Sequence, residues 1–286
     1  MRVVHPERVL YGAGDNRPAR FNLRVPSHFF AGSVFVRALS VLICLLLWQS
    51  ASANRWNVMV NFQNIPAPTE VAEAFIHLVQ SSKLLAHIWS SVARIFVGFG
   101  LAAVLAVGLG LLVGRIRLAA DIFMSPLEVL RPIPAVAWIP LAILMFPNSE
   151  ESMIFITFVG AFFPILLNTI HGVSTIDRRL VFASLTLGAS PVAVFREVIF
   201  PGALPSIVTG LSIGMGTSWF SLVTAEMISG QYGIGYYTWE AYTLQNYPDI
   251  VLGMITIGLL GMLSSMLVRR AGGMLMPWQG CREVKV

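Results

Sequence analysis

The chain has 286 residues, of which 56% are hydrophobic and only 12% are charged, and its formal net charge is +5. Soluble domains carry about 25% charged residues, so this composition excludes a soluble globular domain and indicates a membrane protein. The basic balance does not indicate nucleic-acid binding, because the apolar segments leave almost no chain for a solvent-exposed basic face.

Six apolar segments predict an all-α polytopic membrane protein. A helix of about 20 apolar residues crosses the hydrocarbon core of a bilayer. The expected spans lie near 31–53, 84–113, 119–146, 152–173, 202–228 and 249–268. They predict an N-terminal tail over residues 1–30, a transmembrane domain over 31–271 and a C-terminal tail over 272–286.

The first span could instead be a cleaved signal peptide, because Ala51-Ser52-Ala53 after an apolar run is similar to a cleavage site. The stretch before it exceeds 30 residues, which is too long for an ordinary signal peptide. We therefore expect the span to be retained.

The third predicted span holds a charged residue, Arg131, beside Pro132 and Pro134. Charged groups at membrane depth usually face a water-filled cavity or a partner, and prolines kink a helix there. A guanidinium could bind an anion in a forked geometry. It could equally reach the inner surface or pair with Glu128, and both interpretations remain open.

Polar and aromatic residues recur at helical spacing in the fifth predicted span. They could line a path through the membrane, although Ser and Thr often bond only to their own helix. Glu226 could act at a gate, pair with Arg94 or cap the helix. The candidate path residues are Arg131, Trp138, Ser218, Trp219, Thr224 and Glu226.

The segment from Tyr232 to Tyr247 is rich in Tyr and Trp. This composition is typical of the interface between a membrane and water, here on the outer face of the membrane. With Glu240 and Asp249 it could also help to receive a binding protein.

The basic residues predict the orientation of the spans. Arg and Lys concentrate on the cytoplasmic side of membrane proteins. With both termini inside, fifteen of the nineteen Arg and Lys residues lie inside and only Arg55 and Lys83 lie in outer loops, with Arg94 and Arg131 within spans. Both termini and residues 174–201 are therefore predicted to be cytoplasmic.

No nucleotide-hydrolysing loop is present in the sequence. Such a loop needs a lysine after a glycine-rich turn, but the two lysines of the chain, Lys83 and Lys285, follow no such turn. The cysteines and histidines show no metal-ligand spacing. We therefore expect a chain that is not an enzyme and binds no metal or cofactor of its own.

Several motifs resemble one family of membrane proteins. Phe182-Ala183-Ser184 and Gly188, with Val198-Ile199-Phe200-Pro201 beginning ten residues after Gly188, are similar to the E-A-A-x3-G-x9-I-x-L-P loop of ABC importer permeases. Further similar stretches belong to permeases of the nitrate/sulfonate/taurine/bicarbonate type. They are Ile65-Pro66-Ala67-Pro68, His87-x-x-x-Ser91-x-x-Arg94, Leu130-Arg131-Pro132-Ile133-Pro134, Ala225-Glu226-Met227 and Met276-Pro277-Trp278. The glutamate of the loop pattern is Phe182 here and its third residue is Ser184, so a charged contact cannot be assumed.

The resemblance implies a type I ABC importer permease fold in a bacterial inner membrane. Residues 174–201 would dock onto one of two separate ATPase subunits, which would hold ATP and Mg²⁺. A second permease copy, membrane lipid and a periplasmic or lipid-anchored solute-binding protein would be the other partners, and no nucleic acid is expected. The coupling residues that it implies are Phe182, Ala183, Ser184, Gly188, Ala189, Ser190, Val198, Phe200 and Pro201.

The implied function is import of a small oxyanion (nitrate, sulfonate or taurine, or bicarbonate) by alternating access. Similar permeases also carry thiamine-precursor pyrimidines, so this solute stays an alternative. An ion-gradient-driven transporter would need internal repeats and acidic groups at the midplane, and the sequence shows no repeat. A structural scaffold, or an ordinary amphipathic inner loop over 174–201, would tolerate substitution of Gly188.

Overall fold

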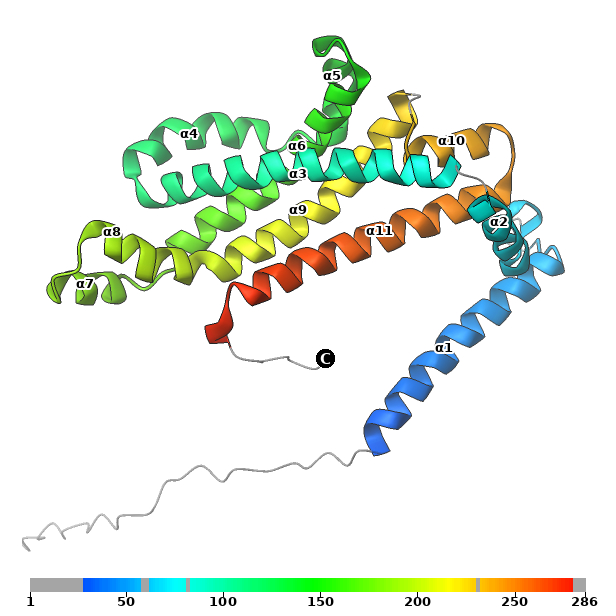
Figure 1. The fold of residues 1–286 in the computed structure, drawn as a ribbon, viewed down its shortest axis with the longest axis horizontal. Coiled ribbons are helices and arrows are strands. Elements are labelled where there is room, and N and C mark those ends of the chain that lie inside the picture. Colours follow the sequence, from blue (N-terminus) through cyan, green and yellow to red (C-terminus); the bar gives the residue numbers. More distant parts are fainter. Residues whose placement is uncertain (1–27, 58–61, 81–82, 230–231, 280–286) are drawn as a thin grey trace, which may run out of the picture. The chain divides into compact units, whose positions relative to one another are not determined.

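The computed structural model describes residues 28–57, 62–80, 83–229 and 232–279, and the regular elements in these ranges are helices (Figure 1). The all-α prediction is thereby confirmed. Contacts divide the chain into two compact units, Met1–Leu47 and Trp48–Val286. Most of the predicted N-terminal tail, and residues 280–286 of the predicted C-terminal tail, lie outside the described residues.

The first unit contributes the larger part of α1 (His28–Ala53). The described side chains of this helix from Phe35 to Leu47 are all exposed, although most are apolar. Apolar side chains on an uncovered helix are suited to contact with lipid tails. The first predicted span is therefore found as a helix that begins at His28.

Five helical segments in the described ranges are long and apolar enough to cross a bilayer. One is the part of α1 from Phe35 to Ala53. The others are α3 (Lys83–Arg115), α6 (Ser149–Ser174), the helical run Pro191–Ser229 and α11 (Tyr247–Met274). They confirm the first, second, fourth, fifth and sixth predicted spans. The helices extend beyond most of the predicted bounds because a helical hydrogen-bond ladder continues into polar flanks.

The third predicted span, 119–146, is not one continuous helix. It consists of α4 (Arg117–Leu130), the 3₁₀ turn η2 (Ala135–Trp138) and α5 (Ile139–Met145), and its two halves are bent by 83°. Pro132 and Pro134 cause the break, because proline lacks a backbone N–H and disfavours a helical residue before it. If the bent pair counts as one span, the described chain has six.

The core of the second unit is built by α3, α6 and α9 (Phe200–Ser229), which lie side by side in Figure 1. Glycines let their backbones approach closely: a Cβ added at Gly110 would lie 2.6 Å from Cβ of Thr169, and one at Gly210 would lie 2.7 Å from Cβ of Asn168. Small residues are the usual means of close helix contact in membranes. The close packing of these three helices therefore requires glycine, which has no side chain, at the contact positions.

Shorter helices surround this core. The helix α2 (Pro68–Gln80), which begins at the end of the motif Ile65-Pro66-Ala67-Pro68, packs on α11. The helix α10 (Ile234–Thr243) packs on α9 and α11. The 3₁₀ turns η1 (Phe62–Asn64) and η4 (Pro277–Gln279) precede α2 and follow α11.

Candidate functional site

The segment 174–201, which the sequence singled out, leaves the bundle as a short helix. This helix, α7 (Arg178–Thr186), begins after Asp177, whose carboxylate accepts a hydrogen bond from the backbone N–H of Arg179 at 2.8 Å. An aspartate in this position satisfies one of the free N–H groups at a helix start. The local sequence therefore defines where α7 begins.

Gly188 ends α7. Its φ angle is +87°, its N–H donates to the carbonyl of Leu185 at 3.0 Å, and the N–H of Ala189 donates to the carbonyl of Ser184 at 3.0 Å. These two bonds make a Schellman cap, which requires a residue in the left-handed region. Glycine adopts that region without a steric penalty, and this explains the residue type at position 188.

After this cap the chain returns to the bundle through a second short helix, α8 (Pro191–Val194). The hydroxyl of Ser190 caps it by accepting from the N–H of Ala193 at 3.2 Å. A π-helical turn, η3 (Phe195–Ile199), then joins α8 to α9 without a break in the helical run. Such single π turns are rare and occur often at functional sites.

None of the nine predicted coupling residues is buried in the core. Phe182 is 64% exposed, and its neighbours Leu187 and Val192, which sequence analysis did not single out, are 88% and 73% exposed. The segment that holds α7 and α8 therefore carries several uncovered apolar side chains.

A cavity of about 350 Å³ lies where the third span breaks, against α6 and α9. Arg131, directly after α4, is the one charged residue among its described lining residues, and the described residues show no ion pair between it and Glu128. The hydroxyl of Thr217 donates to the carbonyl of Gly160 at 2.7 Å, and that of Ser221 donates to the carbonyl of Thr217 at 2.8 Å. The hydroxyl hydrogens of Thr217 and Ser221 are therefore already used within the protein. Arg131 remains as the positively charged hydrogen-bond donor among the described lining residues.

The five other predicted path residues do not line this cavity. Ser218 and Thr224 donate to carbonyl groups of their own helix, at 2.9 Å each. Trp138 and Trp219 pack into an apolar cluster between the helices, and Glu226 joins a charged cluster. Among the predicted path residues, the structure therefore brings Arg131 alone to the cavity.

The charged cluster consists of Arg94, Glu150 and Glu226 and connects α3, α6 and α9. The side chains of Arg94 and Glu226 are 3% and 0% exposed, and Nη1 of Arg94 donates to Oε1 of Glu226 at 2.8 Å. Nε of Arg94 donates to Oε2 of Glu150 at 2.7 Å, and Nη2 donates to the other oxygen of Glu150, which is 56% exposed. Of the three roles considered for Glu226, the structure shows the pairing with Arg94.

Residues around this cluster also hold the turn that leads into α10. The hydroxyl of Ser91 donates to Oε1 of Glu226 at 2.7 Å and accepts from the N–H of Ile234 at 2.9 Å. Nδ1 of His87 accepts from the N–H of Gly233 at 3.1 Å. A Cβ added at Gly233 would lie 2.2 Å from the carboxyl carbon of Glu226, so the turn closes tightly over the carboxylate.

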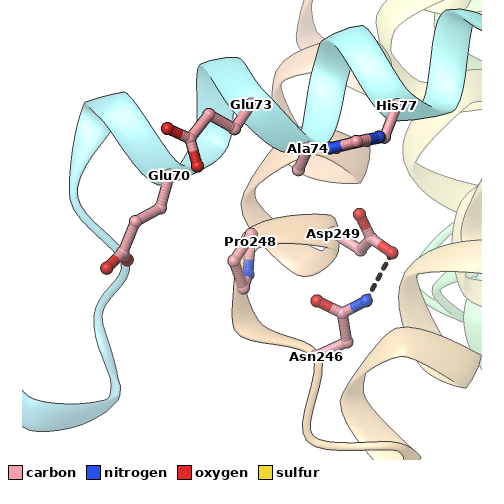
Figure 2. Close-up of a pocket in the computed structure, with 7 residues that line it drawn as sticks. All are labelled: Glu70, Glu73, Ala74, His77, Asn246, Pro248 and Asp249. Carbon is pink, nitrogen blue, oxygen red and sulfur yellow. Dashed lines mark hydrogen bonds between the residues drawn. The ribbon is translucent and has the colours of Figure 1, made fainter.

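A second hollow, of about 510 Å³, lies between α2 and the start of α11 (Figure 2). Glu70, Glu73 and His77 line it from α2. Asp249 lines it from α11 and accepts a hydrogen bond from the side-chain amide of Asn246 at 2.6 Å. Despite this concentration of carboxylates, no three His, Cys, Asp or Glu side chains in the described ranges gather closely enough to hold a metal ion.

Tyr237 on α10 interacts with Asp249, which lines this hollow. Burial, and then the carboxylate of Asp249, raise the pKa of its hydroxyl above the ordinary value for tyrosine. The phenol therefore stays protonated at neutral pH.

The sequence model of one family, described as "Binding-protein-dependent transport system inner membrane component", matches residues 98–279. The match spans most of the bundle and the whole of segment 174–201. The chain belongs to this family. It is a multi-pass permease component of ABC importers, and the sequence-based resemblance is confirmed.

Individual relatives support the same conclusion. The permease is 32% identical over 246 residues to a nitrate import permease protein of Synechocystis sp., covering 83% of this chain and 87% of that one. It is 38% identical over 176 residues to a bicarbonate transport system permease protein of Synechococcus elongatus, covering 61% and 63%. A solved inward-facing methionine ABC transporter has the same fold, with a TM-score of 0.52, 22% identity and coverage of 68% of this chain and 94% of that one.

The residues in and around the permease's charged cluster were not equally predictable from the sequence. His87, Ser91 and Arg94 are spaced by four and three residues, which places them on one face of α3, so their common role was detectable. The role of Glu150 was missed, because a carboxylate in the first turn of a helix is commonly explained by the helix dipole.

Proposed function

We propose that this permease imports a small oxyanion across a bacterial inner membrane and that the anion passes Arg131. Nitrate, bicarbonate and sulfonates such as taurine are the candidate solutes. The observation that carries the proposal is the cavity at the break of the third span, where Arg131 supplies the single charge among the described lining residues.

The chemistry of Arg131 suits such a solute. A guanidinium is planar and presents paired N–H donors that match the oxygens of a carboxylate or a similar anion. The nitrate and bicarbonate that the two relatives are named for are planar anions of this kind. A cavity of about 350 Å³ leaves room for one with some of its water.

The energy for transport would come from two separate ATPase subunits that bind the segment 174–201. The exposed apolar side chains of α7 and α8, Phe182, Leu187 and Val192 among them, support this part of the proposal. Several large apolar side chains exposed on one short segment are suited to a contact with another protein. ATP and Mg²⁺ would be held by the ATPase, and the permease would bind neither.

The permease would act as a homodimer with both termini in the cytoplasm, and a solute-binding protein would deliver the anion from outside. The orientation follows from the positive charge of the predicted inner segments. Two copies are proposed because each chain has one segment 174–201 and the ATPase would work as a pair. The hypothesis of an ion-gradient-driven transporter is set aside by the family match.

The test is uptake into proteoliposomes that contain the permease, its ATPase and its binding protein. For Arg131→Gln we expect uptake of nitrate, bicarbonate or taurine to fall about 10-fold or more, since a bond to a charged donor contributes about 1.5–3 kcal/mol. Arg131→Lys keeps the positive charge but loses the paired N–H donors, so uptake by this variant should fall less.

Arg117→Gln, an exposed arginine at the other end of α4, is the matched control and should transport normally. Unchanged uptake in Arg131→Gln would contradict the proposal. Uptake of a thiamine-precursor pyrimidine with no response to anions would favour the alternative solute.

A further inference from the structure

A third cavity, of about 530 Å³, lies between the end of α3, the end of α6 and α7. Two arginines from different helices line it: Arg115 is the last residue of α3 and Arg178 is the first residue of α7. Most of the other walls are apolar and include Val173, Val181 and Ile199. The cavity therefore combines two cations with a hydrophobic lining.

The charge of Arg178 is not explained by the helix that carries it. A cation at a helix N-terminus meets the positive end of the helix dipole and is unfavourable there. Among the described residues, neither Arg178 nor Arg115 forms an ion pair, and both side chains are exposed. Two unneutralised guanidinium groups at one cavity create a strong preference for an anion.

The place of the cavity indicates what kind of anion. Arg115 is the last residue of the apolar span Leu84–Arg115, so the cavity lies beside one end of a membrane-spanning helix. Leu112 and Ile116, close to Arg115 in the chain, are 42% and 46% exposed and offer apolar surface for acyl chains. Basic pockets between membrane helices on the cytoplasmic side are suited to anionic lipid headgroups.

We propose that this cavity binds the headgroup of an anionic phospholipid, with its phosphate between Arg115 and Arg178. Phe182 and Leu185 on α7 line the same cavity, so a bound lipid would contact the segment 174–201 directly. A lipid in this place would hold α7 against the bundle. This effect on α7 as a coupling element, unlike the binding itself, rests on the proposed function.

The test of binding uses the purified full-length permease in neutral detergent, titrated with phosphatidylglycerol or phosphatidylcholine and followed by native mass spectrometry. We expect phosphatidylglycerol to bind in preference to phosphatidylcholine. The double variant Arg115→Gln/Arg178→Gln should bind phosphatidylglycerol roughly 30-fold more weakly, which corresponds to about 1 kcal/mol for each arginine.

The control variant, Arg117→Gln/Arg179→Gln, removes the same charge from exposed neighbours that do not line the cavity, and it should bind as the wild type does. The proposal is overturned if the two double variants bind phosphatidylglycerol equally. It is also overturned if millimolar inorganic phosphate displaces the lipid completely, since the site would then be one for a small free anion.

A loss of ATPase binding in Arg115→Gln/Arg178→Gln with lipid binding unchanged would assign the arginines to a protein contact instead and would also overturn the proposal. Failure of the permease to stimulate any ATPase while phosphatidylglycerol still binds selectively would reject the proposed function and leave the lipid site standing.

Discussion

Glu150 and Glu226 bind the same guanidinium in very different surroundings. Glu150 is 56% exposed, whereas Glu226 is fully buried and also accepts bonds from Ser91 and the backbone of Gly235. Removing one member of a buried pair leaves an uncompensated charge and unpaired donors. Removing an exposed partner costs little, because water replaces it.

Glu226→Ala should therefore lower the free energy of unfolding by about 3–5 kcal/mol, whereas Glu150→Ala should lower it by about 1 kcal/mol or less. Unfolding of the purified permease in mixed detergent–SDS micelles, followed by tryptophan fluorescence, would measure both. Equal losses in the two variants would contradict the asymmetry of the cluster.

At the scale of the residue, the sequence indicated the role of a side chain where its charge or its helical spacing pointed to a partner. The pairing of Arg94 with Glu226 was predictable because two opposite charges in apolar spans need each other. None of the four candidate path residues on α9 lines the cavity, because helical spacing alone does not say which side of a helix faces its neighbours.

At the scale of the element, the cap of α7 gives Gly188 a specific role. A Cβ added there would meet no atom within 4 Å, so the difficulty of a substitution lies in the backbone angle alone. Asparagine visits the left-handed region readily, but a β-branched residue does so at a cost of about 1–2 kcal/mol or more.

Gly188→Val should therefore disrupt the end of α7 and weaken co-purification with the ATPase by roughly 5- to 30-fold, whereas Gly188→Asn should assemble nearly normally. The measurement is the amount of ATPase retained on tagged permease across a concentration series. If both variants assemble as the wild type does, the segment 174–201 is an ordinary loop.

Element boundaries were predictable where the apolar runs were long and uninterrupted. The break in the third span was foreseen only as a kink at its prolines, whereas its 83° bend depends on what the two halves pack against. The π turn at Phe195–Ile199 left no sign in the sequence, because no residue type specifies it.

At the scale of the whole molecule, the close crossing of α3 and α6 determines whether the bundle packs. Gly108 and Gly110 stand two residues apart on α3, but only a Cβ at Gly110 would collide with Thr169, while one at Gly108 would meet nothing within 4 Å. Substituting alanine at each of these two glycines therefore distinguishes the effect of helix propensity from the effect of helix packing.

Gly110→Ala should lower the free energy of unfolding by about 1–3 kcal/mol through overpacking. Gly108→Ala should leave it unchanged or raise it by up to about 1 kcal/mol, because alanine favours the helix. The same micelle assay tests both variants. A loss in Gly108→Ala as large as that in Gly110→Ala would show that the crossing is not close.

The helical run Pro191–Ser229 has a mechanical consequence. Its 39 residues, at about 1.5 Å each, make a rod roughly 60 Å long that begins beside the cap of α7 and ends just past Glu226. A displacement of the end next to α7 can therefore be transmitted along the helix itself to the end near Glu226, without a chain of side-chain contacts. The π turn η3, close to the end of this run that lies next to α7, is a place where the run can bend before a movement of α7 reaches its other end.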